Sequence, residues 1–167
     1  MSTEYGIRDA AGRLGNIAEI QALVVRNLHW TANEIPLDPS VTISPETTFQ
    51  FAHGKSGSIL RFQIKSFITG KVPAGELFRM ECTHEAFFTV PEGDPTTDLE
   101  LGAFCRVSVF FMVYPFIRET LYGLTGNAGL PVVLLRPWKI PFNPAHGSTS
   151  GVDRAELATP NDEASTA

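Results

Sequence analysis

The chain has 167 residues, of which 43% are hydrophobic and 19% are charged, and this size and composition fit one globular domain with one core. Thirteen Lys and Arg residues against 18 Asp and Glu residues give a net charge of -5, which argues against a surface for nucleic acid or anionic lipid. Residues 1–20 lack the apolar stretch of a secretory signal. We therefore expect a cytoplasmic protein that binds no nucleic acid.

The two ends of the chain differ in composition from its middle. Residues 143–167 contain no aromatic side chain and consist mainly of small and polar residues, a composition that cannot bury enough apolar surface to offset chain entropy. We expect a disordered C-terminal tail over 143–167 and an N-terminal lead segment over 1–19. The packed domain then extends over residues 20–142.

Four segments alternate apolar with polar residues, as half-buried β-strands do. They lie at residues 21–31, 48–53, 58–69 and 76–90. Sequential strands of this kind predict an antiparallel meander. Between the first two strands, residues 34–45 hold three prolines among apolar side chains, which predicts an irregular loop that lies on another part of the molecule.

After the strands the period changes to that of a helix. Thr97 and Glu100 have the spacing of a capping box, which places a helix start near Asp98. The sequence Thr125-Gly126-Asn127 is suited to a left-handed C-cap, so the helix is expected to end near Gly126. Pro115 lies inside this helix and is expected to kink it.

The middle of this helix is apolar on all sides. Between Arg106 and Arg118 only Ser108 is a small polar residue, so Phe111 and Tyr114 are expected to point away from the sheet and to need a second cover. Eleven residues are too few to span a bilayer, and no membrane insertion is expected. The cover is predicted to be another subunit, although burial by the proline-rich loop and the N-terminal segment stays an alternative.

Chemistry that would indicate an enzyme is missing from the sequence. The four histidines never stand at i, i+3 or i+4 from one another or beside a cysteine, and Cys82 and Cys105 lack CxxC spacing, so neither a metal site nor a disulfide framework is indicated. The pattern Gly123, Gly126, Gly129 follows a helix rather than a strand, which is the wrong context for binding phosphate. No catalytic residue, metal or cofactor is predicted.

Three blocks of the chain resemble the SecB family of protein-export chaperones. They are Leu101-Gly102-Ala103-Phe104-Cys105, Tyr114-Pro115-Phe116-Ile117-Arg118-Glu119 and Gly129-Leu130-Pro131. The resemblance covers about residues 20–142, and with Tyr122 and Leu124-Thr125-Gly126 it is closer to the SecB-like chaperones of toxin-antitoxin systems. It implies an α+β fold, in which a long helix packs on a four-stranded antiparallel sheet, and a homotetramer built as a dimer of dimers.

The resemblance also implies a function. Members of the family hold unfolded or non-native polypeptides in apolar grooves without ATP, and the clients here would be preproteins for export or an aggregation-prone antitoxin. Each candidate lining side chain can equally be a core residue. The candidates are Trp30, Ile35, Leu37, Phe110, Phe111, Tyr114, Tyr122, Leu130, Leu134 and Trp138.

Two features of the sequence depart from the family. The translocation motor SecA is a family partner that docks on an acidic sheet surface, but the matching positions here are Asn27, Thr31 and Arg79, and only Glu81 is acidic. The second amphipathic helix that family members carry after the proline motif is also missing or shortened. Two alternatives to a chaperone stay open: a non-enzymatic oligomeric adaptor that docks one folded partner, and a carrier of a small ligand in an aromatic pocket.

Overall fold

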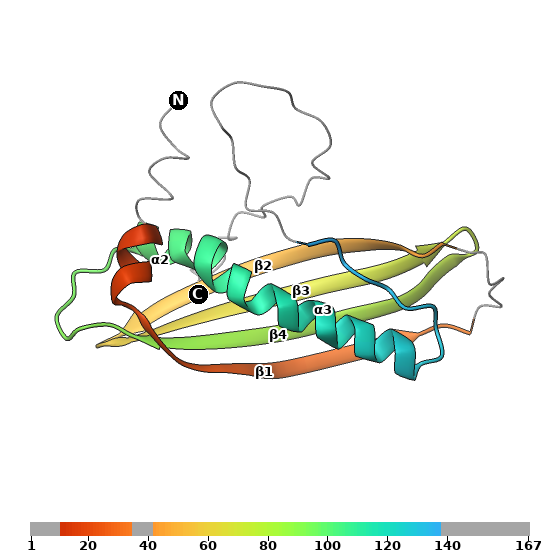
Figure 1. The fold of residues 1–167 in the computed structure, drawn as a ribbon, viewed down its shortest axis with the longest axis horizontal. Coiled ribbons are helices and arrows are strands. Elements are labelled where there is room, and N and C mark those ends of the chain that lie inside the picture. The colour runs from red at the N-terminus through yellow and green to blue at the C-terminus, as the bar shows by residue number, and fades with distance from the viewer. Residues whose placement is uncertain (1–10, 35–41, 138–167) are drawn as a thin grey trace, which may run out of the picture.

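The computed structural model of the chain describes residues 11–34 and 42–137, and Figure 1 shows their arrangement. The α+β fold class predicted from the sequence is confirmed: one four-stranded antiparallel sheet carries one long helical rod. The strands are β1 (Glu19–Ala32), β2 (Ser44–Ser56), β3 (Ile59–Val72) and β4 (Gly75–Thr89). The rod consists of α2 (Asp98–Phe104), a π-helical turn (Cys105–Val109) and α3 (Phe110–Asn127).

The strand order corrects the predicted meander. β2, β3 and β4 do follow one another as hairpins, but β1 pairs with β4, so that the order is β1-β4-β3-β2. β1 and β2 are therefore the two edges of the sheet, about 14 Å apart at three strand spacings. The connection over residues 33–43 is long enough to cross that distance, which is why a simple meander was the wrong expectation.

The rod covers one face of the sheet, as Figure 1 shows. Along β3, Leu60, Phe62, Ile64, Ser66 and Ile68 are buried on this covered face, and the residues that alternate with them are exposed or half-buried on the outer face. Partners across neighbouring antiparallel strands share a face, so the covered face of β4 includes Met80, Cys82, His84 and Phe88. The core lies between this face and the rod.

The helix begins where the capping box predicts. The Thr97 hydroxyl accepts a hydrogen bond from the backbone N–H of Glu100, and the Glu100 carboxylate accepts one from the backbone N–H of Thr97. The rod then continues through Pro115 to Asn127. Its 30 residues are long and apolar enough to cross a membrane, so the eleven-residue count underestimated its length. The core helix of a soluble protein meets the same criterion, and half of the apolar window is buried inside the protein.

The helix ends slightly later than predicted. Gly129, at φ +68°, is the left-handed glycine, rather than Gly126. Its N–H donates to the carbonyl of Gly126, and the N–H of Leu130 donates to the carbonyl of Thr125 at 3.0 Å. This pair of bonds is a Schellman motif, and it turns the chain back along the helix.

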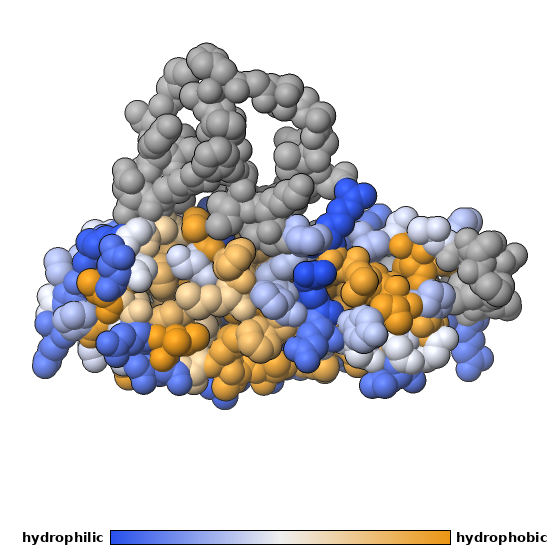
Figure 2. Space-filling model, in the orientation of Figure 1, coloured by the Kyte–Doolittle hydropathy of each residue, from blue (hydrophilic) through white to orange (hydrophobic). Residues whose placement is uncertain are grey.

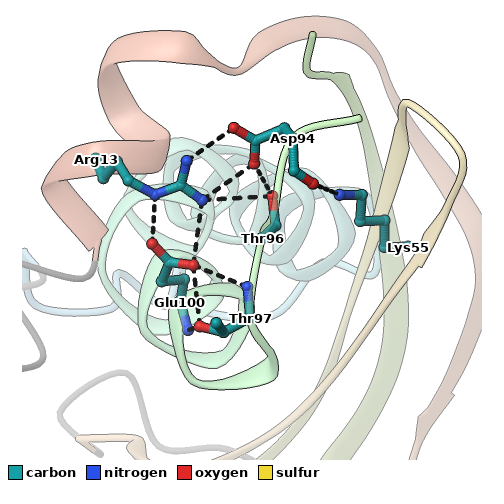
Figure 3. Close-up of polar contacts among 6 residues, drawn as sticks. All are labelled: Arg13, Lys55, Asp94, Thr96, Thr97 and Glu100. Carbon is teal, nitrogen blue, oxygen red and sulfur yellow. Dashed lines mark hydrogen bonds and ion pairs between the residues drawn. The ribbon is translucent and has the colours of Figure 1, made fainter. Parts of the chain in front are cut away.

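The N-terminal segment is part of the packed body. Residues 11–17 are helical, and Leu14 is fully buried in the core. Arg13 of this helix donates hydrogen bonds to the carboxylate of Asp94, which lies just before α2, and to that of Glu100, which lies inside α2 (Figure 3). The packed body therefore begins before residue 20. The predicted tail over 143–167 and most of the proline-rich loop lie outside the described residues.

Candidate functional site

The two sides of α3 carry similar side chains with opposite exposure. The side that faces the sheet is buried and consists of Phe110, Val113, Tyr114, Ile117, Leu121 and Thr125. On the other side, Phe111, Met112, Phe116 and Tyr122 are each between 40% and 55% exposed. Large apolar side chains left open along one helix are typical of a surface that binds protein. The prediction that this helix has more apolar surface than its own sheet covers agrees with this exposure.

Two of the predicted lining residues belong to the core instead. Phe110 has no exposed surface and packs edge-on against Phe49 and Phe51 of β2, with ring centroids 4.8 and 5.3 Å away. Tyr114 follows Phe110 by four residues, and residues so spaced lie on the same side of an α-helix. Tyr114 is accordingly buried, which corrects the expectation that it points away with Phe111.

The Tyr114 hydroxyl ties the end of the described chain to the helix. It donates a hydrogen bond of 2.6 Å to the backbone carbonyl of Arg136. Burial raises the pKa of this phenol, and the positive charge of Arg118, one turn further along α3, acts in the opposite direction. The phenol therefore stays protonated and keeps its role as donor.

Residues 131–137 run antiparallel to α3 along the side that carries Tyr114. The backbone N–H of Val133 donates to the hydroxyl of Thr125 at 3.4 Å, near the helix end, and Arg136 meets Tyr114 about three turns earlier. Side chains of this extended segment alternate. Val133 and Leu135 are buried, whereas Val132 and Leu134 are 49% and 61% exposed.

Exposed apolar side chains of α3 and of residues 131–137 lie along the same side of the molecule. At about 100° per residue, Phe111 and Tyr122 of α3 point within about 20° of each other, toward the side where Tyr114 and Thr125 hold the segment. We define the exposed strip as Phe111, Tyr122, Val132 and Leu134. Figure 2 shows the face that contains the rod, where apolar surface lies in two areas separated by a hydrophilic band.

Arg118 lies within this strip along the helix. It is four residues before Tyr122 and seven after Phe111, so it points to the same side of α3. Its side chain is half-buried, and its buried Nε has no hydrogen-bond partner. Within residues 11–34 and 42–137, Arg118 forms no ion pair.

A second exposed apolar surface lies on edge strand β1. Ile20, Val25 and Leu28 are exposed, although each pairs with a covered-face residue of β4. On α3, Met112 and Phe116 point away from the exposed strip, since Phe116 lies about 160° around the helix from Arg118. We define the edge surface as Val25, Leu28, Met112 and Phe116.

The other predicted lining residues are distributed as follows. Trp30 is half-buried on β1 and stacks on Phe78 with ring centroids 4.8 Å apart, and Leu130 is half-buried after the Schellman turn. Ile35, Leu37 and Trp138 lie outside the described residues. Val132, Met112 and Phe116 are exposed apolar side chains that were not predicted as lining residues. Helical spacing from Phe111 and alternation after Pro131 are signals that could have found them.

The outer face of the sheet carries charges that are paired with one another. Lys65 bonds Glu81 at 2.6 Å, and Glu85, almost fully buried, accepts from both Arg26 and Arg61. Hydrogen bonds from these arginines, that of Arg61 foremost, lower the pKa of the Glu85 carboxyl despite its burial. Asn27, Thr31 and Arg79 share this face with Glu81.

Two buried polar groups on β4 have no reactive character. The sulfur of Cys82 lies 3.6 Å from Nδ1 of His84, and burial raises the pKa of the thiol to about 11 and lowers that of the imidazole. Both groups therefore stay neutral near pH 7, and an un-ionised thiol is a poor nucleophile. In the described part of the chain, no three His, Cys, Asp or Glu side chains are grouped to hold a metal ion.

Comparison with solved structures identifies the fold. A SecB-like chaperone from Mycobacterium tuberculosis, Rv1957, solved in complex with a ChAD peptide from the Rv1956 HigA1 antitoxin, matches with a TM-score of 0.73. The match covers 80% of this chain and 99% of that one, at 23% sequence identity. The fold is SecB-like.

The other comparisons add no family to this SecB-like fold. A protein of unknown function from Streptococcus agalactiae matches with a TM-score of 0.37 at 14% identity, covering 71% of this chain and 96% of that one. So low a score carries no argument about the fold. No protein-family model matches the sequence, and no curated protein matches it either.

Proposed function

We propose that this protein is an ATP-independent chaperone, a holdase, of the toxin-antitoxin type, with an aggregation-prone antitoxin as its client. The observation that carries the proposal is the exposed strip, which we propose as the client-binding surface and from here call the client strip. It lies open on a fold shared with a SecB-like chaperone that was solved with an antitoxin peptide. No catalytic role is proposed. Non-native preproteins for export are a wider client class that the same surface would accept.

The physical basis of binding is avidity. An unfolded segment presents apolar side chains every few residues, and several shallow contacts made by one chain reinforce one another through effective concentration. Such binding tolerates many sequences and consumes no nucleotide. Release then follows from folding of the client or from competition by its partner toxin.

We place the client along α3 and the segment beside it. Phe111, Tyr122 and Leu134 supply exposed apolar contacts, and half-buried Trp30 and Leu130 are proposed as further contacts where the client extends beyond the strip. Ile35, Leu37 and Trp138 complete the proposed groove as residues outside the described ranges. Phe110 and Tyr114 support this surface from the core.

We further propose a homotetramer in which the edge surface meets another copy of the chain. Val25, Leu28, Met112 and Phe116 are exposed apolar side chains that a soluble monomer would leave in water. Burying such side chains is worth about 2 kcal/mol each. A dimer of dimers that closes these surfaces would keep the client strip free.

The outer sheet face argues against SecA as a partner. Its buried Glu85 is neutralised by two arginines, and its Glu81 is paired with Lys65. Acidic groups that are already paired in this way offer little attraction to a cationic docking site. We therefore propose that the protein acts apart from the translocation motor.

Aggregation of a refolding client tests the proposal. We expect the full chain to suppress aggregation of a chemically unfolded model protein at near-equimolar ratio without ATP, and Tyr122→Asp combined with Leu134→Asp to lose this activity. Arg79→Gln, on the outer face, is the matched control and should suppress as well as the wild type. Suppression of no client would refute the proposal, and a partner that binds equally well when folded would favour the adaptor.

A further inference from the structure

We propose that Arg118 is a carboxylate-binding position within the client strip, so that the protein favours client segments with an Asp or Glu between two large apolar side chains. This inference rests on the proposed function and specifies its substrate class. Its starting point is a charged side chain inside an apolar surface, where a charge without a partner is costly.

The guanidinium of Arg118 lacks a partner for its buried Nε. Arg118 is half-buried, its Nε is removed from water, and it has no ion pair in the described part of the chain. The hydroxyl of Tyr114, one turn before Arg118, is committed to the carbonyl of Arg136. Glu119, the adjacent acid, is exposed and turned about 100° around the helix.

A carboxylate is the client group that a guanidinium such as that of Arg118 binds best. A planar guanidinium binds a carboxylate through two parallel N–H···O bonds, and a charge-assisted pair of this kind is about twice as strong as a neutral hydrogen bond. The partial burial of the Arg118 guanidinium, whose Nε is removed from water, strengthens the attraction further.

The spacing of Arg118 from the aromatic residues of the strip sets the spacing of a matching client segment. With a rise of about 1.5 Å per residue, Arg118 lies about 10 Å from the level of Phe111 and about 6 Å from that of Tyr122. An extended peptide advances about 3.3 Å per residue. A matching client segment therefore places its acid about three residues from one apolar anchor and about two residues from the other.

The inference is tested by measuring, with fluorescence anisotropy, how tightly the full chain binds three labelled peptides. The peptides are 15 residues long and identical, with two Phe anchors at the spacing above and Asp, Asn or Lys at the position between them. We expect the Asp peptide to bind about tenfold more tightly than the Asn peptide, which is about 1.4 kcal/mol, and the Lys peptide to bind most weakly. In Arg118→Gln the preference for Asp over Asn should disappear, and an unchanged circular dichroism spectrum and thermal midpoint would show that the variant is folded.

Arg106→Gln is the matched control, because Arg106 is another half-buried arginine of the same rod outside the strip, and it should keep the preference for Asp. An equal preference in wild type and Arg118→Gln would overturn the carboxylate site but leave the proposed function standing. Binding of neither Phe-containing peptide would overturn both. A change in solution mass for Arg118→Gln would show that another copy of the chain occupies Arg118, and would overturn the inference.

Discussion

The two sides of α3 show how alike in composition a core and an exposed helix surface can be. Phe110 and Tyr114 on one side are buried against β2, and Phe111 and Tyr122 on the other side are about half exposed. What separates them is the position of each residue around the helix, which the capping box at Thr97 and the π-helical turn after Phe104 fix relative to the sheet. Residue type alone therefore does not assign an aromatic side chain to either role.

The largest effect is expected for the adjacent pair Phe110 and Phe111. Phe110→Ala removes a fully buried ring and should lower the free energy of unfolding by about 3–5 kcal/mol. Phe111→Ala should lower it by less than about 1 kcal/mol and should instead weaken peptide binding. Denaturant unfolding and peptide anisotropy measure the two effects. Equal destabilisation by both substitutions would mean that the two sides of the helix do not differ as described.

The next largest effect is expected on assembly, when an Asp is placed on the edge surface and, for comparison, on the client strip. Phe116→Asp places a charge on the proposed copy-to-copy contact and should reduce the mass in solution from tetramer to dimer, because burying an unpaired charge is unfavourable. Tyr122→Asp, a similar change on the client strip, should leave the mass unchanged. Light scattering measures both. If the Phe116→Asp variant kept the mass of a tetramer, α3 would not be part of the interface.

Acid stability tests the contact between the N-terminal helix and α2. Hydrogen bonds from Arg13 are the main cause that lowers the pKa of Asp94 and of Glu100 to about 2, from ordinary values of 3.8 and 4.5. A carboxyl whose pKa is lower in the folded state contributes stability that is complete above its ordinary value and is lost as pH falls toward the folded value. The wild type should therefore be more stable than Arg13→Met at pH 7, and the difference should close between about pH 5 and pH 2.

Unfolding by urea at a series of pH values measures this difference. Arg79→Met is the control, because it removes an arginine whose pair with Glu76 lies on the exposed outer face, and exposed pairs contribute little. A difference between wild type and Arg13→Met that stays constant with pH would assign the effect to packing of the Arg13 side chain instead.

Local patterns in the sequence predicted the elements well. The four strands, the capping box at Thr97 and the long helix follow from alternation and spacing within a few residues. Contacts between distant residues were not predictable in this way. The pairing of β1 with β4 and the bonds from Arg13 to Asp94 and Glu100 join residues far apart in the chain, and no local period encodes them.

The exposure of the candidate lining residues followed from the sequence only in part. Phe111, Tyr122 and Leu134 are exposed, as lining residues would be, whereas Phe110 and Tyr114 are buried. Four-residue spacing alone places Tyr114 beside Phe110, so this error was avoidable. Arg118 was noted as the end of the apolar run, but its unpartnered Nε depends on how neighbouring side chains pack, which the sequence does not reveal.

The smallest expected effect concerns the bond that holds the segment against α3. Tyr114→Phe removes the hydroxyl that donates to the carbonyl of Arg136 and leaves the buried ring in place, so the free energy of unfolding should fall by only about 1 kcal/mol. Because this bond holds one end of residues 131–137, peptide binding should weaken as Leu134 loses its position. Tyr122→Phe, which removes an exposed hydroxyl, is the control for stability. If Tyr114→Phe lowered stability but left peptide affinity unchanged, Leu134 would have to be removed from the client strip.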